Sequence, residues 1–178
     1  MADDAVILDR WQKPYSANKA NLARRDLAVK FIPPNSRVLD LGCGAMALRD
    51  VLPQGCSYVG VDVLPHHPGV VVANLNMLEF PHGEFDVTTL LGVVEYLENP
   101  IWAFRKIRER SERLIFSYEA VYFWTQSAIA KSEEECRLNF YRPKELKYIL
   151  SRTGWTPYAV VPFKNRNSKF TNYKRLYV

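Results

Sequence analysis

The sequence predicts one α/β domain with a mainly parallel β-sheet and helices on both faces. Short apolar, β-branched runs alternate with amphipathic segments along the chain, which is typical of such sheets. A length of 178 residues suits one domain, and 48% hydrophobic with 24% charged residues suits a globular core. No run of about 18 apolar residues predicts a membrane span. The acidic first residues do not resemble a secretory signal.

The first part of the chain contains two predicted helices and three predicted strands. Residues 18–32 carry leucine, valine and phenylalanine among alanine and charged residues, and a Pro-Pro pair ends this amphipathic helix. Residues 37–41 form a short buried strand, from which a glycine turn leads into a helix at 45–52. Residues 57–62 and 70–73 are apolar strands, and the linker between them is too short for the usual crossover helix.

The middle of the chain continues the alternation of strands and helices. Three β-branched residues favour a strand at 85–91. A proline at a typical helix start then leads into a helix at 101–110. Residues 113–116 form a fifth strand, and a helix at 141–152 begins with a proline and ends near a glycine.

Two final strands, at residues 155–161 and 172–178, complete a sheet of about seven strands. We expect the sixth strand to run parallel to the first five. The seventh must return antiparallel, because residues 162–171 are too few for a crossover. Ligands of such sheets bind at the carboxyl ends of the strands, where the strand order reverses. The turn after the first strand is therefore the expected ligand site.

That turn has the sequence DLGCG at residues 40–44. Its glycines permit a sharp bend and a close approach to a ligand, and a helix beginning there would offer unpaired N–H groups. Gly42, Gly44 and Ala47 fit the dinucleotide fingerprint G-x-G-x-x-G/A, although that match alone is weak. Asp62 ends the second strand, where a carboxylate can accept hydrogen bonds from ribose hydroxyls in any nucleotide ligand.

Asp40 distinguishes between two classes of nucleotide ligand, those with a pyrophosphate and those with a cationic amino acid part. A carboxylate two residues before the first glycine would repel a pyrophosphate but suits a ligand with an ammonium and a sulfonium group. S-adenosylmethionine is such a ligand. The alternative is that Asp40 only caps the turn.

Four segments occur in the order found in one enzyme family. They are DLGCG at 40–44, VGVD at 59–62, FPHGEFDV at 80–87 and GVVEYLENP at 92–100. Together they resemble the class I S-adenosylmethionine-dependent methyltransferases, in particular small bacterial proteins of types 11 and 23. The resemblance implies a Rossmann-like sheet with an antiparallel last strand, and S-adenosylmethionine as the cofactor.

The resemblance also implies which residues contact the cofactor. They are Tyr15, Asp40, Gly42, Cys43, Gly44, Asp62, Val63, Asn74, Leu75, Leu91 and Gly92. Tyr15 would belong to a lid before the first helix. Asn74 stands where the family has an acid, and Tyr96 stands where it often has a histidine, so a histidine base is not expected.

Methyl transfer needs little from the protein beyond orientation and a base for the acceptor proton. Glu95 follows the fourth strand and Glu119 follows the fifth, so both are candidate bases. Glu95 could instead stabilise the start of the next helix. Aromatic residues just past the fifth strand, including Tyr118, Tyr122 and Trp124, could line the acceptor site or pack as an amphipathic helix.

The charge of the chain is divided unevenly. Residues 137–178 have a net charge of +9, and residues 1–136 have a net charge of −4. Lys164, Arg166 and Lys169 lie between the last two strands, where they could attract an anionic acceptor. The alternative is a solvated basic face.

We therefore expect a single methyltransferase domain with a small, anionic acceptor. It would comprise a lid and helix (1–34), a cofactor-binding core (35–120) and an acceptor-side region (121–178). An RNA methyltransferase and a non-catalytic cofactor-binding partner subunit remain alternatives. The three cysteines have no metal-ligand spacing, so we expect free thiols in the cytoplasm, no metal and no membrane association.

Overall fold

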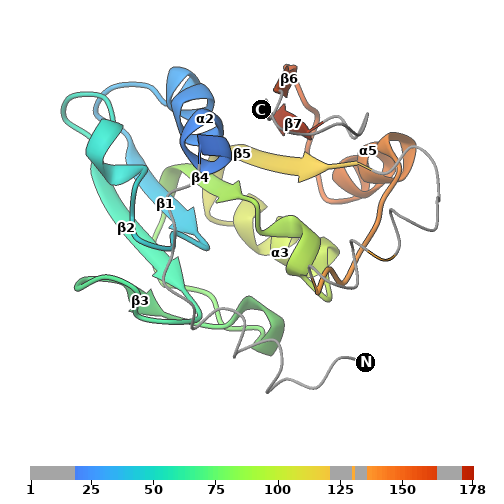
Figure 1. Ribbon diagram of the computed structural model, residues 1–178, viewed down its shortest axis with the longest axis horizontal. Coiled ribbons are helices and arrows are strands. Elements are labelled where there is room, and N and C mark those ends of the chain that lie inside the picture. Colours follow the sequence, from blue (N-terminus) through green and yellow to red (C-terminus); the bar gives the residue numbers. More distant parts are fainter. Residues whose placement is uncertain (1–18, 121–129, 131–135, 164–173) are drawn as a thin grey trace.

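The computed structural model describes residues 19–120, 130, 136–163 and 174–178. Within them, a seven-stranded sheet has the order β3-β2-β1-β4-β5-β7-β6 (Figure 1). The strands are β1 (Arg37–Leu41), β2 (Ser57–Asp62), β3 (Val71–Val72), β4 (Phe85–Leu91), β5 (Ser111–Glu119), β6 (Val160–Phe163) and β7 (Lys174–Tyr177). The strand order reverses at β1, which lies between β2 and β4.

The strand directions confirm the predicted topology. Strands β1 to β5 pair in parallel with their neighbours. Strand β7 is antiparallel to both β5 and β6, so β6 runs in the same direction as β5. No helix forms between β2 and β3, as the short linker predicts.

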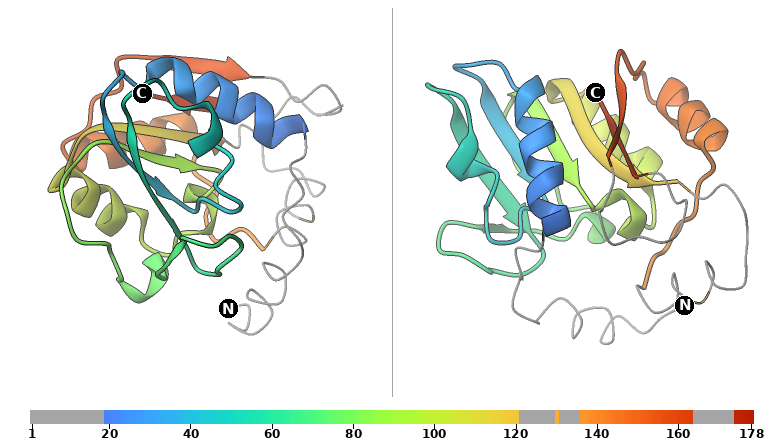
Figure 2. Two further views of the ribbon diagram at one scale, coloured as in Figure 1. Left: turned by 90° about the vertical axis from the view of Figure 1, so that its left-hand side faces the viewer. Right: turned by 45° about the horizontal axis from the view of Figure 1, so that its top comes forward.

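Helices cover both faces of the sheet. Helix α2 (Lys19–Ala28) lies on one face, and α3 (Pro100–Arg108) and α5 (Pro143–Arg152) lie on the other (Figure 2). Four further turns of the described residues are short 3-10 helices, η1 (Val29–Phe31), η2 (Arg49–Val51), η3 (Leu75–Met77) and η4 (Val94–Tyr96). The helices of the described segments all fall short of the length and apolar character that a bilayer crossing requires.

Local sequence signals explain where α3 and α5 begin. The side-chain oxygen of Asn99 accepts a hydrogen bond from the backbone N–H of Trp102 at 2.9 Å, and Pro100 occupies the first turn. In α5, the Glu145 carboxylate accepts from the backbone N–H of Arg142 at 2.7 Å. The first residues of both helices are therefore explained by capping residues that the sequence shows.

The sheet is buried on both faces, so alternate residues of one strand belong to different cores. On the α2 face, the buried residues include Ala28, Ile32, Val38, Val87, Ile115 and Leu176. On the α3 and α5 face, they include Leu39, Leu41, Leu90, Phe104, Ile107, Leu146 and Leu150.

The prediction of a helix at residues 45–52 is wrong. This segment forms turns and only the single 3-10 turn η2. Met46 has a left-handed backbone with φ of 60° and a buried side chain. A left-handed residue interrupts a right-handed helix, so no helix of normal length follows the glycine turn.

The sixth strand begins later than its sequence predicts, at Val160 instead of Trp155. The Trp155 indole N–H donates to the backbone oxygen of Phe104 at 2.9 Å, and the Arg108 guanidinium lies 5.1 Å from the ring centroid. Trp155 is therefore an anchor for α3 and not a strand residue.

Candidate functional site

The ends of four parallel strands bring the predicted site residues to one edge of the sheet. Strands β1, β2, β4 and β5 run in the same direction, so their carboxyl ends share that edge. The glycine turn follows β1, Asp62 ends β2, Gly92 follows β4 and Glu119 ends β5. The edge therefore combines two carboxylates with two segments of glycine backbone.

The glycine turn is folded back onto the end of β2. The backbone N–H groups of Gly42 and Cys43 both donate to the backbone oxygen of Val61, at 2.7 and 3.0 Å. The N–H of Gly44 donates to a carboxylate oxygen of Asp62 at 2.8 Å. Asp62 thus holds the turn in place in addition to any contact with a ligand.

Packing at the turn requires glycine at position 42. Its φ is 75°, and a Cβ atom there would lie 2.2 Å from Cγ2 of Val93. The neighbouring Cys43 thiol is buried, and burial together with the carboxylates of Asp40 and Asp62 raises its pKa. Cys43 therefore stays a neutral thiol and fills space in the turn.

Asp40 lies inside the α2 face, only 3% exposed. Its two carboxylate oxygens accept hydrogen bonds from the Tyr58 hydroxyl at 2.7 Å and the Thr89 hydroxyl at 2.6 Å. Burial raises the pKa of Asp40, and the nearby Asp62 carboxylate raises it further, whereas the two hydrogen bonds lower it. Two neighbouring strands therefore supply the hydroxyl groups that hold this buried acid.

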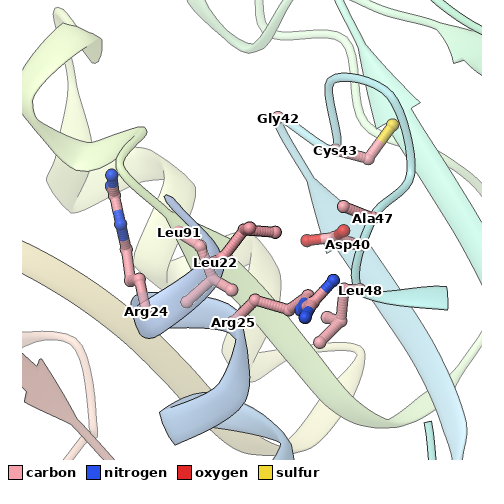
Figure 3. A pocket seen from close by; sticks show the side chains of 9 residues that line it. All are labelled: Leu22, Arg24, Arg25, Asp40, Gly42, Cys43, Ala47, Leu48 and Leu91. Carbon is pink, nitrogen blue, oxygen red and sulfur yellow. The ribbon is translucent and has the colours of Figure 1, made fainter. Parts of the chain in front are cut away.

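A pocket opens between α2 and the ends of β1 and β4 (Figure 3). Its lining residues are Leu22, Arg24, Arg25, Asp40, Gly42, Cys43, Ala47, Leu48 and Leu91. Four of the predicted cofactor contacts, Asp40, Gly42, Cys43 and Leu91, thus meet at one pocket. The two arginines come from α2 and bring positive charge to the side opposite the turn.

The predicted contacts beyond β2 and β3 are Val63, which directly follows β2, Asn74, which precedes η3, and Leu75, which begins η3. Val63, Asn74 and Leu75 are all half-buried. The side-chain oxygen of Asn74 accepts from the N–H of Asn76 at 3.0 Å, and Asn76 in turn donates to the backbone oxygen of Tyr96 at 3.0 Å. This chain of hydrogen bonds joins the end of β3 to the loop after β4.

The two candidate bases are in different electrostatic states. Glu119 is buried and forms an ion pair with Arg137, whose side chain is 9% exposed. Glu95 is also buried, and its Oε1 accepts from the backbone N–H of Glu119 at 2.9 Å. Its Oε2 is buried without a hydrogen-bond partner within the described part of the chain. An unpartnered carboxylate oxygen at this depth is rare in folded proteins.

Residues 136–142 are fastened to the loop after β4. The backbone N–H groups of Leu138 and Asn139 donate to the backbone oxygen of Glu95 at 2.9 and 3.3 Å. The Tyr118 hydroxyl donates to the side-chain oxygen of Asn139 at 2.9 Å and accepts from the N–H of Tyr141 at 2.6 Å. Tyr118 is 1% exposed, and burial raises the pKa of its hydroxyl. It therefore holds this segment from inside.

Several predicted residues lie outside the described part of the chain. They are Tyr15, Tyr122, Trp124, Lys164, Arg166 and Lys169. Conversely, the sequence reasoning missed Arg24, Arg137 and Asn139. A single basic or amide side chain carries no local signal of such a role, because its partners are far away in the sequence.

The comparisons with known proteins agree with this fold. The family model for a methyltransferase domain matches residues 12–160. The chain matches none of the curated proteins. Three similar solved structures come from a cyanobacterium, a thermophilic bacterium and a halophilic archaeon.

The cyanobacterial structure is the magnesium protoporphyrin IX methyltransferase of Synechocystis with bound S-adenosylhomocysteine. It is 14% identical, covers 98% of each chain and has a TM-score of 0.66. A SAM-dependent methyltransferase of Thermotoga maritima is 15% identical, covers 89% of this chain and 87% of its own, and has a TM-score of 0.62. A methyltransferase of Haloferax volcanii, solved with the Trm112 methyltransferase activator, is 14% identical, covers 90% and 91%, and has a TM-score of 0.64.

Proposed function

Because the chain belongs to the methyltransferase-domain family and is an S-adenosylmethionine-dependent methyltransferase, we propose that it methylates a small, anionic acceptor. The observation that supports S-adenosylmethionine as the methyl donor is the pair of carboxylates around the glycine turn, Asp40 and Asp62. A sulfonium and an ammonium group suit this acidic surrounding, whereas a pyrophosphate would be repelled.

The residues at the turn fit S-adenosylmethionine in charge and in hydrogen bonding. One oxygen of Asp62 accepts from Gly44, and the other lies a long 3.4 Å from the N–H of Leu64, so lone pairs remain for ribose hydroxyls. When bound, the cofactor supplies a methyl group that is already activated on a sulfonium sulfur. The protein then has to orient the acceptor and receive its proton.

We assign the remaining cofactor contacts by position. Val63, Asn74 and Leu75 would surround the adenine, where the Asn74 carbonyl could accept a hydrogen bond from the adenine amino group. Leu91 and Gly92 would lie under the methionine part, and Tyr15 would close over it.

Glu95 is the better candidate for the base. Its Oε2 is buried and unpartnered within the described residues, so it can accept the proton that an acceptor hydroxyl or amine loses. The charge of Glu119 is already balanced by its ion pair with Arg137. Glu95→Gln should lower kcat by about 100- to 10,000-fold without weakening cofactor binding. An unchanged kcat in the folded variant would exclude Glu95 as the base.

The anionic acceptor is proposed from the charge and the topology. Residues 137–178 have a net charge of +9. Strand β6 runs parallel to β5, so its last residue, Phe163, belongs to the carboxyl edge, and the next residue is Lys164. A cleft edged by one sign of charge concentrates ligands of the other sign. A carboxylated or phosphate-bearing metabolite, or a nucleotide-linked sugar, would suit it. The aromatic residues Tyr122 and Trp124 are assigned to the same side, whereas Tyr118 is buried and holds residues 136–142 from inside.

Two other functions each have one supporting observation. The same cations could contact an RNA backbone. The Haloferax volcanii methyltransferase was solved with an activator, which supports a partner-dependent role as the third candidate for this chain. We also place the protein in the cytoplasm, because its three cysteines are free thiols.

The direct experiment has a donor arm and an acceptor arm. Calorimetry should show binding of S-adenosylmethionine and none of NAD. A screen of anionic and neutral metabolites and of short RNAs, with S-adenosylhomocysteine as the product measured, should find turnover with an anionic metabolite. Turnover with RNA alone would favour the second function, and turnover that requires an added partner would favour the third.

A further inference from the structure

The loop after β4 that carries Glu95 is held in place by other parts of the chain. Its 3-10 turn, η4, closes with hydrogen bonds from the N–H of Tyr96 to the backbone oxygen of Val93 at 2.8 Å and from the N–H of Leu97 to that of Val94 at 3.3 Å. A single 3-10 turn has poor hydrogen-bond geometry and does not hold its own shape. The position of Glu95 therefore depends on contacts from outside the loop.

Asn139 supplies three of those contacts, and it is buried. Its side-chain Nδ2 donates to the backbone oxygens of Val94 at 2.6 Å and Leu97 at 3.0 Å. Its backbone N–H, together with that of Leu138, donates to the backbone oxygen of Glu95, at 3.3 and 2.9 Å. One buried residue thus binds the carbonyl before Glu95, the carbonyl of Glu95 itself and the carbonyl two residues after it.

Strand β5 orients Asn139 through Tyr118. The Tyr118 hydroxyl donates to the side-chain oxygen of Asn139 at 2.9 Å, which leaves the amide hydrogens for the carbonyls of the loop. The same hydroxyl accepts from the backbone N–H of Tyr141 at 2.6 Å. The next residue of β5, Glu119, donates its backbone N–H to Oε1 of Glu95 at 2.9 Å. Strand β5 therefore fixes Glu95 twice, directly at the carboxylate and through Asn139 at the backbone.

A second asparagine, Asn76, binds the same loop from the β3 side. Its Nδ2 donates to the backbone oxygen of Tyr96 at 3.0 Å, and its side-chain oxygen accepts from the N–H of Glu98 at 3.0 Å. Both of these contacts come after Glu95 in the loop. Of the two asparagines, Asn139 is therefore the one that contacts the backbone of Glu95.

We propose that Asn139 is a positioning residue for methyl transfer, which fixes the Glu95 carboxylate where it receives the acceptor proton. The proposal rests on the proposed function, because it presumes that Glu95 is the base. In that reaction the acceptor atom bonds to the methyl carbon as the carbon–sulfur bond breaks, and the acceptor proton passes to Oε2 of Glu95. A base must lie within hydrogen-bond distance of the proton that it receives. A misplacement of about 1 Å at such a site can lower the rate about 100-fold.

The kinetic test asks whether the effect of Asn139 requires Glu95. Steady-state kinetics would give kcat for the wild type, Asn139→Ala, Glu95→Gln and the double variant, with the anionic metabolite that turns over fastest in the acceptor screen. Calorimetry with S-adenosylmethionine would establish that each variant is folded and binds the donor. Asn76→Ala is the matched control, because it removes two side-chain hydrogen bonds from the same loop.

A second measurement needs no acceptor. The backbone N–H of Glu119 donates to Oε1 of Glu95, so hydrogen exchange at that amide reports whether the carboxylate stays in place. NMR would follow this exchange in the wild type, Asn139→Ala, Asn76→Ala and Tyr118→Phe. Tyr118→Phe keeps the aromatic ring and removes the hydroxyl that orients Asn139, so it provides the test if Asn139→Ala does not fold.

The expected result is a loss of kcat that depends on Glu95. Asn139→Ala should lower kcat by about 10- to 100-fold, with nearly unchanged KM for the acceptor and affinity for S-adenosylmethionine. In the Glu95→Gln background the same change should cause little further loss, because the base is already absent. Tyr118→Phe should show a smaller loss of the same kind. The Glu119 amide should exchange faster in both Asn139→Ala and Tyr118→Phe than in Asn76→Ala.

Several outcomes would overturn the proposal. If Asn139→Ala lowered kcat as much in the Glu95→Gln background as in the wild type, Asn139 would only support the fold. An equal loss in Asn76→Ala, or unchanged kcat and unchanged exchange in a folded Asn139→Ala, would also contradict it.

Failure of the proposed function gives a different result. In that case Glu95→Gln alone keeps the wild-type kcat, or the screen finds no acceptor. A wild-type kcat in Glu95→Gln would remove this inference together with the base. If the screen finds no acceptor, exchange at the Glu119 amide decides whether Asn139 fixes Glu95, and an unchanged exchange rate would overturn the inference.

Discussion

Asp40 is a buried acid whose charge is useful for a cationic ligand and costly for the fold. Tyr58 and Thr89 donate hydrogen bonds to it, but burial outweighs them and raises its pKa. The folded protein therefore holds the Asp40 proton to a higher pH than the unfolded chain does. Its contribution to stability is fully present below the usual pKa of 3.8 and is lost as the pH rises through the folded pKa.

This direction of the pH dependence gives a prediction for Asp40→Asn, which removes the titrating group. The variant should gain unfolding free energy relative to the wild type as the pH rises above 4, while its affinity for S-adenosylmethionine falls. Urea unfolding at several pH values, with calorimetry of the cofactor at neutral pH, would measure both effects. A stability difference that does not change with pH, or that changes in the opposite direction, would contradict it.

Asp62 differs from Asp40 because it is tied to the turn by a backbone hydrogen bond as well as being available to a ligand. Asp62→Ala should weaken S-adenosylmethionine by about 10- to 150-fold, since a charge-assisted hydrogen bond to the ribose is lost. Calorimetry of the folded variant is the measurement. Asp62→Asn, which keeps an oxygen for the N–H of Gly44, is the control for loosening of the turn. Unchanged affinity in both variants would remove Asp62 from the site.

Among the elements, the segment after the glycine turn departs most from its sequence pattern. Residues 45–52 contain good helix formers, and the helix nevertheless fails because Met46 is left-handed. Backbone conformation at one residue is set by packing that no local pattern records. The strands, by contrast, were predictable from short apolar runs, because burial on both faces demands such residues.

The left-handed Met46 can be tested by exchanging it for alanine and glycine. Glycine carries no penalty at positive φ, so Met46→Gly should be more stable than Met46→Ala by about 1 kcal/mol. A helical position has the opposite order, so Ala103→Gly in α3 should destabilise by about 1 kcal/mol. Chemical denaturation gives the three values. If alanine proved better than glycine at position 46, the turn would have to be helical.

The ion pair between Glu119 and Arg137 joins β5 to the described segment that begins at residue 136. Both side chains are less than one-tenth exposed. Arg137→Met should therefore destabilise the protein by about 3–5 kcal/mol, because Glu119 is left buried without this cation. The double variant Glu119→Gln, Arg137→Met should recover much of that loss in thermal or urea unfolding. A single variant as stable as the wild type would show that the pair contributes nothing.

At the scale of the whole molecule, the strand directions and the carboxyl-edge site follow from the sequence, but the partners within the site do not. The motifs place Asp40, Gly42 and Asp62 because each lies at the end of a recognisable strand or directly after it. Arg24 and Arg137 become site residues only after α2 and the segment at 136–142 have packed onto the sheet. Long-range packing therefore decides which charges meet, and it leaves no signal in neighbouring residues.

The division of charge is also a property of the whole molecule, and it leads to the last prediction. Lys164, Arg166 and Lys169 follow the carboxyl end of β6, so replacing all three with Gln removes positive charge beside the proposed acceptor site. KM for an anionic acceptor should rise, most strongly at low salt, where steering is least screened. Affinity for S-adenosylmethionine should not change.

A matched triple variant tests whether the rise in KM depends on where the three positive charges lie or only on the net charge of the protein. Arg105, Arg113 and Arg152 are exposed and belong to elements near the amino ends of the strands. Replacing these three with Gln changes the net charge equally, so it should leave KM nearly unchanged if proximity matters. Steady-state kinetics with an anionic and a neutral acceptor would separate the two cases. An equal rise of KM in both triple variants, or an equal loss for both acceptors, would refute the assignment of an anionic acceptor to this edge.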